Sequence, residues 1–147
     1  MTQYKDWGIP LGRRFRALKL WFHLRLDGVE AIRARLRRDL DNARWLAEQV
    51  SSTPGWRVLA PVNLQTVVLR HEPAGVVSAT GAVLDAGALN AHTLAWADEV
   101  NTSGAALLTP SLLDGTWSVR VSIGAEATER QDVEALWRLL RQAAETG

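Results

Sequence analysis

The sequence predicts an α+β domain in which a mainly antiparallel sheet of about four strands is covered by helices. Three observations support this fold class. Four segments with helical periodicity and four short segments rich in β-branched residues follow one another in the order ααββαββα. Asp114-Gly115 lies between two of the β-rich segments and is a strong hairpin signal. The chain has 147 residues, 47% of them hydrophobic, which is enough for one domain with a hydrophobic core.

The first predicted helix covers residues 13–26 and follows an extended lead-in. Pro10 disfavours helix at Ile9, and Gly12 permits a sharp turn before the helix begins. Apolar residues cover nearly the whole circumference of this helix: Phe15, Ala17, Leu18, Leu20, Trp21, Phe22, Leu24 and Leu26. A helix that is apolar all round is normally buried all round, and a chain of 147 residues can cover one side of it at best. We therefore expect its other side to contact a further protein surface.

Asp27-Gly28 interrupts the helical pattern, and a second helix is predicted for residues 29–51. Its apolar stripe repeats at helical spacing, and arginines occupy the opposite face. The short β-rich segments 56–60 and 66–71 are predicted to be strands. Residues 72–87 are rich in Gly and Ala and have no clear periodicity, so no regular element is predicted there.

The second half of the chain contains the remaining helices and strands. A third helix is predicted for residues 88–103, with Gly104 as its C-cap. Strands are predicted for residues 106–112 and 117–123, joined by the Asp-Gly hairpin turn. Thr128 is predicted to be the N-cap of the last helix.

The composition excludes several classes of function. The net charge of +1 gives no electrostatic case for binding nucleic acid or a membrane surface. Arginines are concentrated in residues 13–44 but are interleaved with acidic residues, which favours a solvated helix face. The chain has no cysteine, so it has no disulfide, thiolate metal site or cysteine nucleophile. No apolar run approaches the roughly 20 residues of a membrane span, and no secretory signal is present, so we expect a soluble cytoplasmic protein.

Few residues suggest self-contained catalysis. The histidines His23, His71 and His92 have no metal-ligand spacing. The position of His23 in an apolar helix favours a packed or interface histidine, whereas His71 and His92 are predicted to lie on the solvated surface. Lys5 and Lys19 are the only lysines, and neither lies in a sequence that favours a buried Schiff-base lysine. The chain by itself is therefore not predicted to be a complete enzyme.

Arg120 is the exception, because it interrupts a strand that otherwise carries no charge. An arginine in such a strand needs a partner for its guanidinium, usually a carboxylate in bidentate geometry. One interpretation is an internal ion pair, and the candidate carboxylates are Asp85, Asp98, Asp114 and Glu126. The other is a clamp for an anionic group of a substrate. The residues alone favour the ion pair.

A series of motifs follows in a characteristic order along the chain. Residues 6–22 (DWGIPLGRRFRALKLWF) combine a Gly/Pro turn, three arginines and an apolar helix. Shorter motifs follow: 28–33 (GVEAIR), 101–104 (NTSG), 113–115 (LDG), Val119-Arg120 and 128–137. Together they resemble the C-terminal part of the group II amino-acid decarboxylases, the aromatic-L-amino-acid decarboxylase family, which depend on pyridoxal phosphate and have fold type I. The resemblance covers nearly all of this chain but only the last part of a family member.

The resemblance implies a domain organisation and a site. Residues 1–27 match the end of the catalytic-loop region and the junction helix, and residues 28–147 match the C-terminal small domain. Arg120 matches an arginine at the active site that is implicated in contacting the substrate carboxylate, which reverses the preference for an internal ion pair. The family's cofactor lysine matches no position in this chain, so we expect no covalently bound pyridoxal phosphate here and no activity from the chain alone.

Two hypotheses of different classes follow. In the first, the chain is the small-domain fragment of a pyridoxal-phosphate-dependent L-amino-acid decarboxylase, a carboxy-lyase of aromatic amino-acid metabolism, which closes the cleft and presents Arg120 to the amino-acid substrate. In the second, it is a non-catalytic interaction or dimerisation domain derived from such an enzyme, associating through the Phe15–Leu26 helix as a homo-oligomer. The sequence leaves the choice of amino acid open.

Overall fold

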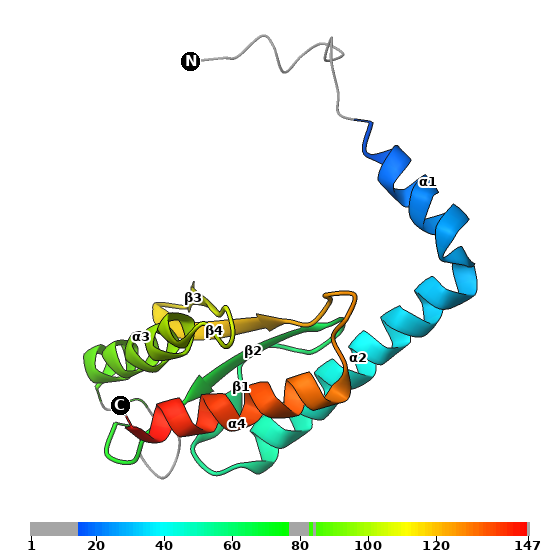
Figure 1. Cartoon of the computed structure of the whole chain (residues 1–147). Helices are drawn as coiled ribbons and strands as arrows, with labels where there is room; N and C mark the ends of the chain where they lie inside the picture. Colours follow the sequence, from blue (N-terminus) through cyan, green and yellow to red (C-terminus); the bar gives the residue numbers. More distant parts are fainter. Residues whose placement is uncertain (1–14, 77–82, 84, 147) are drawn as a thin grey trace, which may run out of the picture. The chain divides into compact units, whose positions relative to one another are not determined.

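A computed structural model describes residues 15–76, 83 and 85–146 of the chain (Figure 1). The chain forms two compact units, Met1–Arg35 and Leu36–Gly147, which we call the N-terminal and the C-terminal unit. The predicted extended lead-in and part of the predicted loop at 72–87 lie outside the described residues.

The described part of the N-terminal unit is helical. Helix α1 spans Ala17–Leu26, and helix α2 spans Gly28–Ser52, so that α2 begins in this unit and continues into the next. Gly28 separates the two helices with a φ of 78°, a conformation that glycine adopts without steric cost. None of the residues of α1 is buried. The predicted apolar helix is therefore present, and within its own unit its apolar side chains are exposed.

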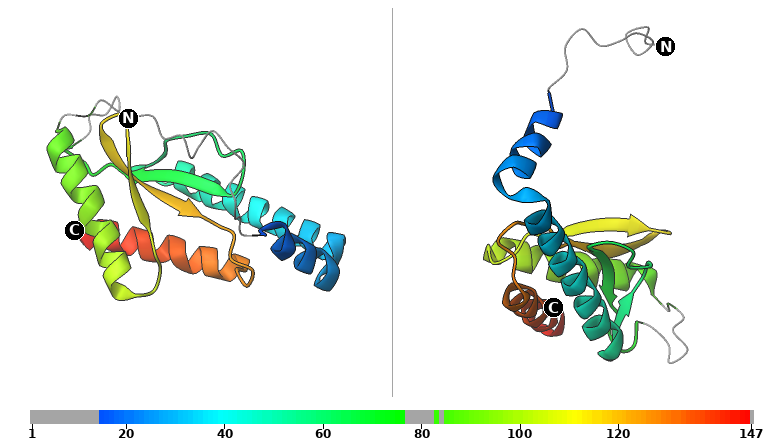
Figure 2. Two further views of the ribbon diagram at one scale, coloured as in Figure 1. Left: turned by 90° about the horizontal axis from the view of Figure 1, so that it is seen from above. Right: turned by 90° about the vertical axis from the view of Figure 1, so that its right-hand side faces the viewer.

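The sheet of the C-terminal unit has four strands: β1 (Trp56–Val58), β2 (Thr66–His71), β3 (Thr109–Leu113) and β4 (Thr116–Ser122). Their spatial order is β1-β2-β4-β3, and every neighbouring pair is antiparallel (Figure 2). This confirms the predicted fold class.

The predicted hairpin joins β3 to β4. Asp114 and Gly115 have φ values of 48° and 78°, as the two central residues of a type I′ turn require. The predicted start of the preceding strand at residue 106 is wrong, because β3 begins only at Thr109. The reason is a side chain in the preceding helix: Asn101 accepts a hydrogen bond from the backbone N–H of Leu108 at 2.6 Å and donates to its carbonyl at 3.2 Å.

The starts of the other two helices differ from the predictions by a few residues, whereas Gly104 is the C-cap of the third helix, as predicted. Helix α3 spans Ala86–Ser103 and begins earlier than predicted because the Asp85 side chain caps it, accepting a hydrogen bond from the N–H of Ala88. Helix α4 spans Arg130–Thr146. The prediction of Thr128 as its N-cap is wrong, because Glu129 precedes the helix and donates its N–H to Asp132 Oδ2 at 2.8 Å.

One hydrophobic core joins the sheet to α2, α3 and α4. Three tryptophans meet in it: the Trp56 ring of β1 lies 5.7 Å from that of Trp96 in α3 and 4.9 Å from that of Trp137 in α4, both in edge-to-face geometry. Helices α2 and α4 lie side by side (Figure 2), with Arg38 donating to Glu129 at 2.6 Å. These contacts fix the strands that carry the candidate site.

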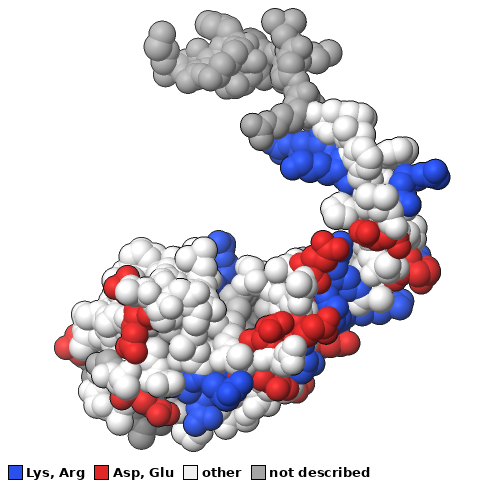
Figure 3. Space-filling model, in the orientation of Figure 1, with Lys and Arg blue, Asp and Glu red and all other residues white. Residues whose placement is uncertain are grey.

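The arginines of α2 lie among acidic residues, and the two signs are interspersed along the helix in Figure 3. Arg33 pairs with Glu30 and Arg44 with Asp41 in exposed i,i+3 contacts. This agrees with a solvated helix face.

Candidate functional site

Arg120 lies in the middle of β4, with its side chain exposed. Its neighbours Val119 and Val121 are buried in the core, so the alternation of a strand places Arg120 on the opposite face of the sheet. The register sets Val68 of β2 beside it on one side and Thr109 of β3 on the other. The guanidinium therefore extends from a central strand of a rigid sheet.

Within the described residues Arg120 makes no hydrogen bond and no ion pair. Asp85, one of the carboxylates proposed as its partner, instead caps α3. The ion-pair interpretation of the sequence thus has no support in the part of the chain that the structure describes. An exposed guanidinium on a fixed strand has all its N–H donors available to an anion.

Hydroxyl groups share the face of the sheet on which Arg120 lies. Thr66 of β2 and Ser122 of β4 are register partners, and their hydroxyl oxygens are 3.2 Å apart. Ser118 donates its hydroxyl to the carbonyl of Ser111 across the β3–β4 pair at 2.9 Å. The neighbours of Arg120 on this face are therefore hydroxyl groups and the apolar Val68, and none of these positions carries an acidic side chain.

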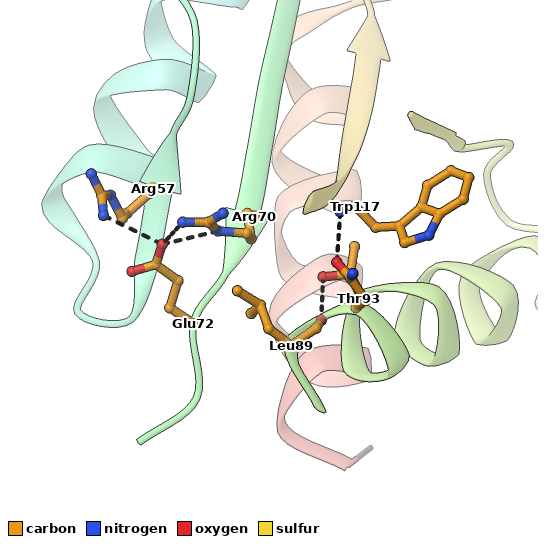
Figure 4. A network of polar contacts seen from close by, with 7 residues as sticks. Arg57, Arg70, Glu72, Leu89, Thr93 and Trp117 are labelled. Atoms are coloured by element: carbon orange, nitrogen blue, oxygen red, sulfur yellow. Dashed lines mark hydrogen bonds and ion pairs between the residues drawn. The ribbon is translucent and has the colours of Figure 1, made fainter. Parts of the chain in front are cut away.

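A network of polar contacts holds the neighbouring strands in place (Figure 4). Glu72 accepts hydrogen bonds from both Arg70 and Arg57, and the side chains of Arg70 and Glu72 are nearly buried. At the start of β4, the backbone N–H of Trp117 donates to Asn90 Oδ1 of α3 at 2.7 Å. The strand that carries Arg120 is therefore tied to α3 three residues before the arginine.

His71 and His92 meet, and their assignment to the solvated surface is wrong. Both rings are partly buried, and His71 Nδ1 lies 2.8 Å from His92 Nε2. The signal was present in the sequence. His71 follows Val67 and Leu69 at the spacing of two that faces a strand's core side, and His92 lies one turn before Trp96. His23, by contrast, is exposed and contacts Asp27 at 3.0 Å.

The described residues do not fit covalently bound pyridoxal phosphate. Lys19 is the only lysine among them, and it lies exposed on α1 rather than in a pocket. Across residues 15–76, 83 and 85–146 there is no cluster of three or more metal-ligating side chains. No helix in the same part of the chain is long and apolar enough to cross a membrane. The chemistry that the described site offers is anion binding by Arg120.

The fold and the sequence identify the class of protein. Residues 1–72 match the pyridoxal-dependent decarboxylase conserved domain. The fold matches the crystal structure of Oryza sativa TDC with PLP and tryptamine with a TM-score of 0.80 and 26% identity, over 99% of this chain and 30% of that one. These matches support a fragment of a group II pyridoxal-phosphate-dependent decarboxylase.

Tryptophan and tyrosine decarboxylases are among the similar curated proteins. Tryptophan decarboxylase TDC1 of Camptotheca acuminata is 33% identical over 145 residues, which are 99% of this chain and 28% of that protein. Tyrosine decarboxylase 1 of Narcissus pseudonarcissus is 34% identical over 144 residues, which are 98% of this chain and 28% of that protein. The chain thus spans less than a third of the length of these relatives.

Proposed function

We propose that this chain supplies the small domain of a pyridoxal-phosphate-dependent decarboxylase that acts on an aromatic L-amino acid. In this proposal residues 28–147 form the small domain, and residues 1–27 form the junction to a large domain that holds the cofactor. Membership of the decarboxylase family supports the reaction class. The names of several relatives, which are tryptophan and tyrosine decarboxylases, support an aromatic substrate.

The role proposed for Arg120 is to bind and orient the α-carboxylate of the amino acid. A guanidinium binds a carboxylate through two parallel N–H···O bonds, which fixes the plane of the carboxylate as well as its distance. The observation that carries this role is the exposed Arg120 on a central strand, without a partner among the described residues. Binding of the substrate would supply the missing carboxylate.

The cofactor in the complete enzyme would be held by residues other than those described here, because Lys19 is exposed and no other described lysine exists. Pyridoxal phosphate supplies the electron sink for the loss of carbon dioxide. This chain contributes the arginine and the surface that carries it. It is therefore not expected to be a catalyst by itself.

A chimera tests the role of Arg120. This chain replaces the equivalent segment of Oryza sativa TDC, and KM for L-tryptophan is measured for the chimera and for its Arg120→Gln variant. Loss of a charged hydrogen-bond pair costs about 1.5–3 kcal/mol, so KM is expected to rise about tenfold to a hundredfold. Inhibition by tryptamine, which has no carboxylate, is expected to stay unchanged.

The matched control is Arg141→Gln, which removes an exposed arginine from α4 and should leave both constants unchanged. An equal loss of affinity for L-tryptophan and tryptamine in Arg120→Gln would mean that the arginine supports the fold rather than the carboxylate. A KM for L-tryptophan that does not change would exclude the contact altogether.

A second candidate function is self-association through the Phe15–Leu26 helix. The observation that favours it is the exposure of large apolar side chains on α1 and just before it: Phe15, Leu18, Leu20, Trp21, Phe22, Leu24 and Leu26. A contiguous apolar surface of this kind usually marks an interface. The proposed occupant is α1 of a second copy of the chain.

Light scattering on the purified chain tests the second candidate. The chain is expected to form dimers, and the double variant Leu20→Glu/Leu24→Glu is expected to be monomeric, because two carboxylates would have to be desolvated in the interface. The control variant is Leu64→Glu, which changes an exposed leucine of the C-terminal unit. This variant is expected to remain dimeric. A wild-type monomer at all concentrations would rule out self-association.

A further inference from the structure

His71 and His92 form a contact that the proposed function does not use. His71 ends β2, and His92 lies in the first half of α3, so the contact joins two elements that are distant in sequence. The nitrogens His71 Nδ1 and His92 Nε2 are 2.8 Å apart, and the ring centroids are 5.1 Å apart. The His71 ring also packs on Trp56 of the core at 4.9 Å. The pair therefore connects the hydrophobic core to α3.

The contact depends on the protonation state of the two rings. A hydrogen bond between imidazole nitrogens needs an N–H on one ring and a free lone pair on the other. When both rings are protonated, two N–H groups face each other and two positive charges lie a few ångströms apart. The bond between His71 and His92 is therefore present only while at least one of them is neutral.

The surroundings favour the neutral rings. Burial lowers the pKa of His71, and His92 lowers it further, whereas Glu145 of α4 and Glu72 raise it by a smaller amount. Burial also lowers the pKa of His92. Glu72 is already engaged by Arg57 and Arg70. Its carboxylate is therefore largely compensated, and Glu145 is the remaining acidic group that acts on the pair.

The first turns of α3 are the element that this contact controls. Asp85 caps the helix, and Asn90 accepts the N–H of Trp117 at the start of β4. His92 follows Asn90 by two residues and is linked to β2 rather than to β4. Loss of the histidine contact would remove a side-chain link between β2 and this half of α3.

We propose that His71 and His92 are a proton-controlled latch, which holds the first half of α3 on β2 at neutral pH and releases it in mild acid. Release lowers the local stability of residues 86–93 before the rest of the C-terminal unit unfolds. The Asn90–Trp117 contact lies in the released segment, so the start of β4 loosens with it.

The direction of the pH dependence follows from the pKa values. A histidine in the unfolded chain has a pKa of 6.5, and both histidines lie below that value when folded. As the pH falls through 6.5, the unfolded chain therefore binds more protons than the folded chain. The free energy of opening of the latch falls with each unit of pH in this range. The contribution of the latch to stability is complete above pH 6.5. It is lost as the pH falls toward the lower pKa values of the two histidines in the folded chain.

Hydrogen exchange on the purified chain tests the latch. Protection of the amides in residues 86–93, corrected for the intrinsic exchange rate, is compared at pH 7.5 and pH 5.5 with that of residues 133–140 in α4. In the wild type, protection of the α3 segment is expected to fall about tenfold or more relative to α4. In His92→Gln and in His71→Gln the fall in relative protection is expected to be smaller than in the wild type, because one buried ring still titrates, and in the double variant His71→Gln/His92→Gln the relative protection is expected to be the same at both pH values. The control His23→Gln should behave as the wild type.

NMR titration of the histidine C2 protons supplies a second readout that needs no variant. The latch requires the folded rings of His71 and His92 to titrate below 6.5, the pKa of a histidine in an unfolded chain. The proposal fails if both titrate at or above it. It also fails if α3 protection is independent of pH in the wild type, or if it falls equally in His92→Gln.

Discussion

Trp96→Ala is expected to lower the free energy of unfolding of the C-terminal unit by about 3–5 kcal/mol. The Trp96 side chain is 0% exposed and is the largest fully buried side chain of the described residues. It packs against Trp56 and lies between α3 and the sheet, so its removal leaves a cavity that rigid neighbours cannot fill. A domain is stable by about 5–15 kcal/mol, so the variant is expected to lose a large part of its stability.

Urea denaturation followed by circular dichroism measures this loss. Trp21→Ala is the matched control, because Trp21 is 53% exposed on α1, and it is expected to change stability by less than about 0.5 kcal/mol. Trp96→Phe gives a finer test. The indole N–H of Trp96 has no hydrogen-bond partner among the described residues, so phenylalanine removes an unsatisfied donor as well as volume. A loss in Trp96→Phe as large as that in Trp96→Ala would contradict this packing.

Glu72→Gln is expected to cost about 3–5 kcal/mol, because it leaves a buried charge without its partner. The side chains of Glu72 and Arg70 are only 7% and 9% exposed, and one carboxylate oxygen of Glu72 accepts from Arg70 and Arg57. A glutamine keeps the shape but removes the negative charge. The guanidinium of Arg70 would then lie desolvated on β2 with only an amide oxygen beside it.

The same denaturation experiment measures this cost against two controls. Glu30→Gln breaks the exposed pair with Arg33 and is expected to cost no more than about 1 kcal/mol, since solvent screens such pairs. Arg70→Met combined with Glu72→Gln removes both charges and is expected to recover most of the loss. If the double variant were as unstable as Glu72→Gln, the cost would come from packing rather than from the unpaired charge.

The order of the helices and strands could be predicted from the sequence because it depends on local signals. Helical and alternating periodicity place each segment, and Asp114-Gly115 places the hairpin. The errors are at the ends of elements. Asn101 delays β3 and Asp85 advances α3, and both act through side-chain contacts with the backbone of residues further along. Periodicity carries no information about such contacts.

The candidate site was found through the resemblance, not through periodicity. Arg120 stood out as a lone charge in an apolar strand, and the residues alone favoured an internal ion pair. No such pair exists among the described residues, and the exposed side chain on a central strand supports anion binding. The contact of Arg120 with a substrate carboxylate stays a prediction.

Local pattern and residue chemistry thus determined the α+β class, the hairpin and the apolar α1, and the motifs carried the resemblance to the decarboxylase family. Only the tertiary structure decided which distant side chains meet: Glu72 with Arg70 and Arg57, and His71 with His92. The physical reason is that propensity and periodicity act over a few residues. Pairing of a strand with a helix 21 residues further on depends on how the whole core packs.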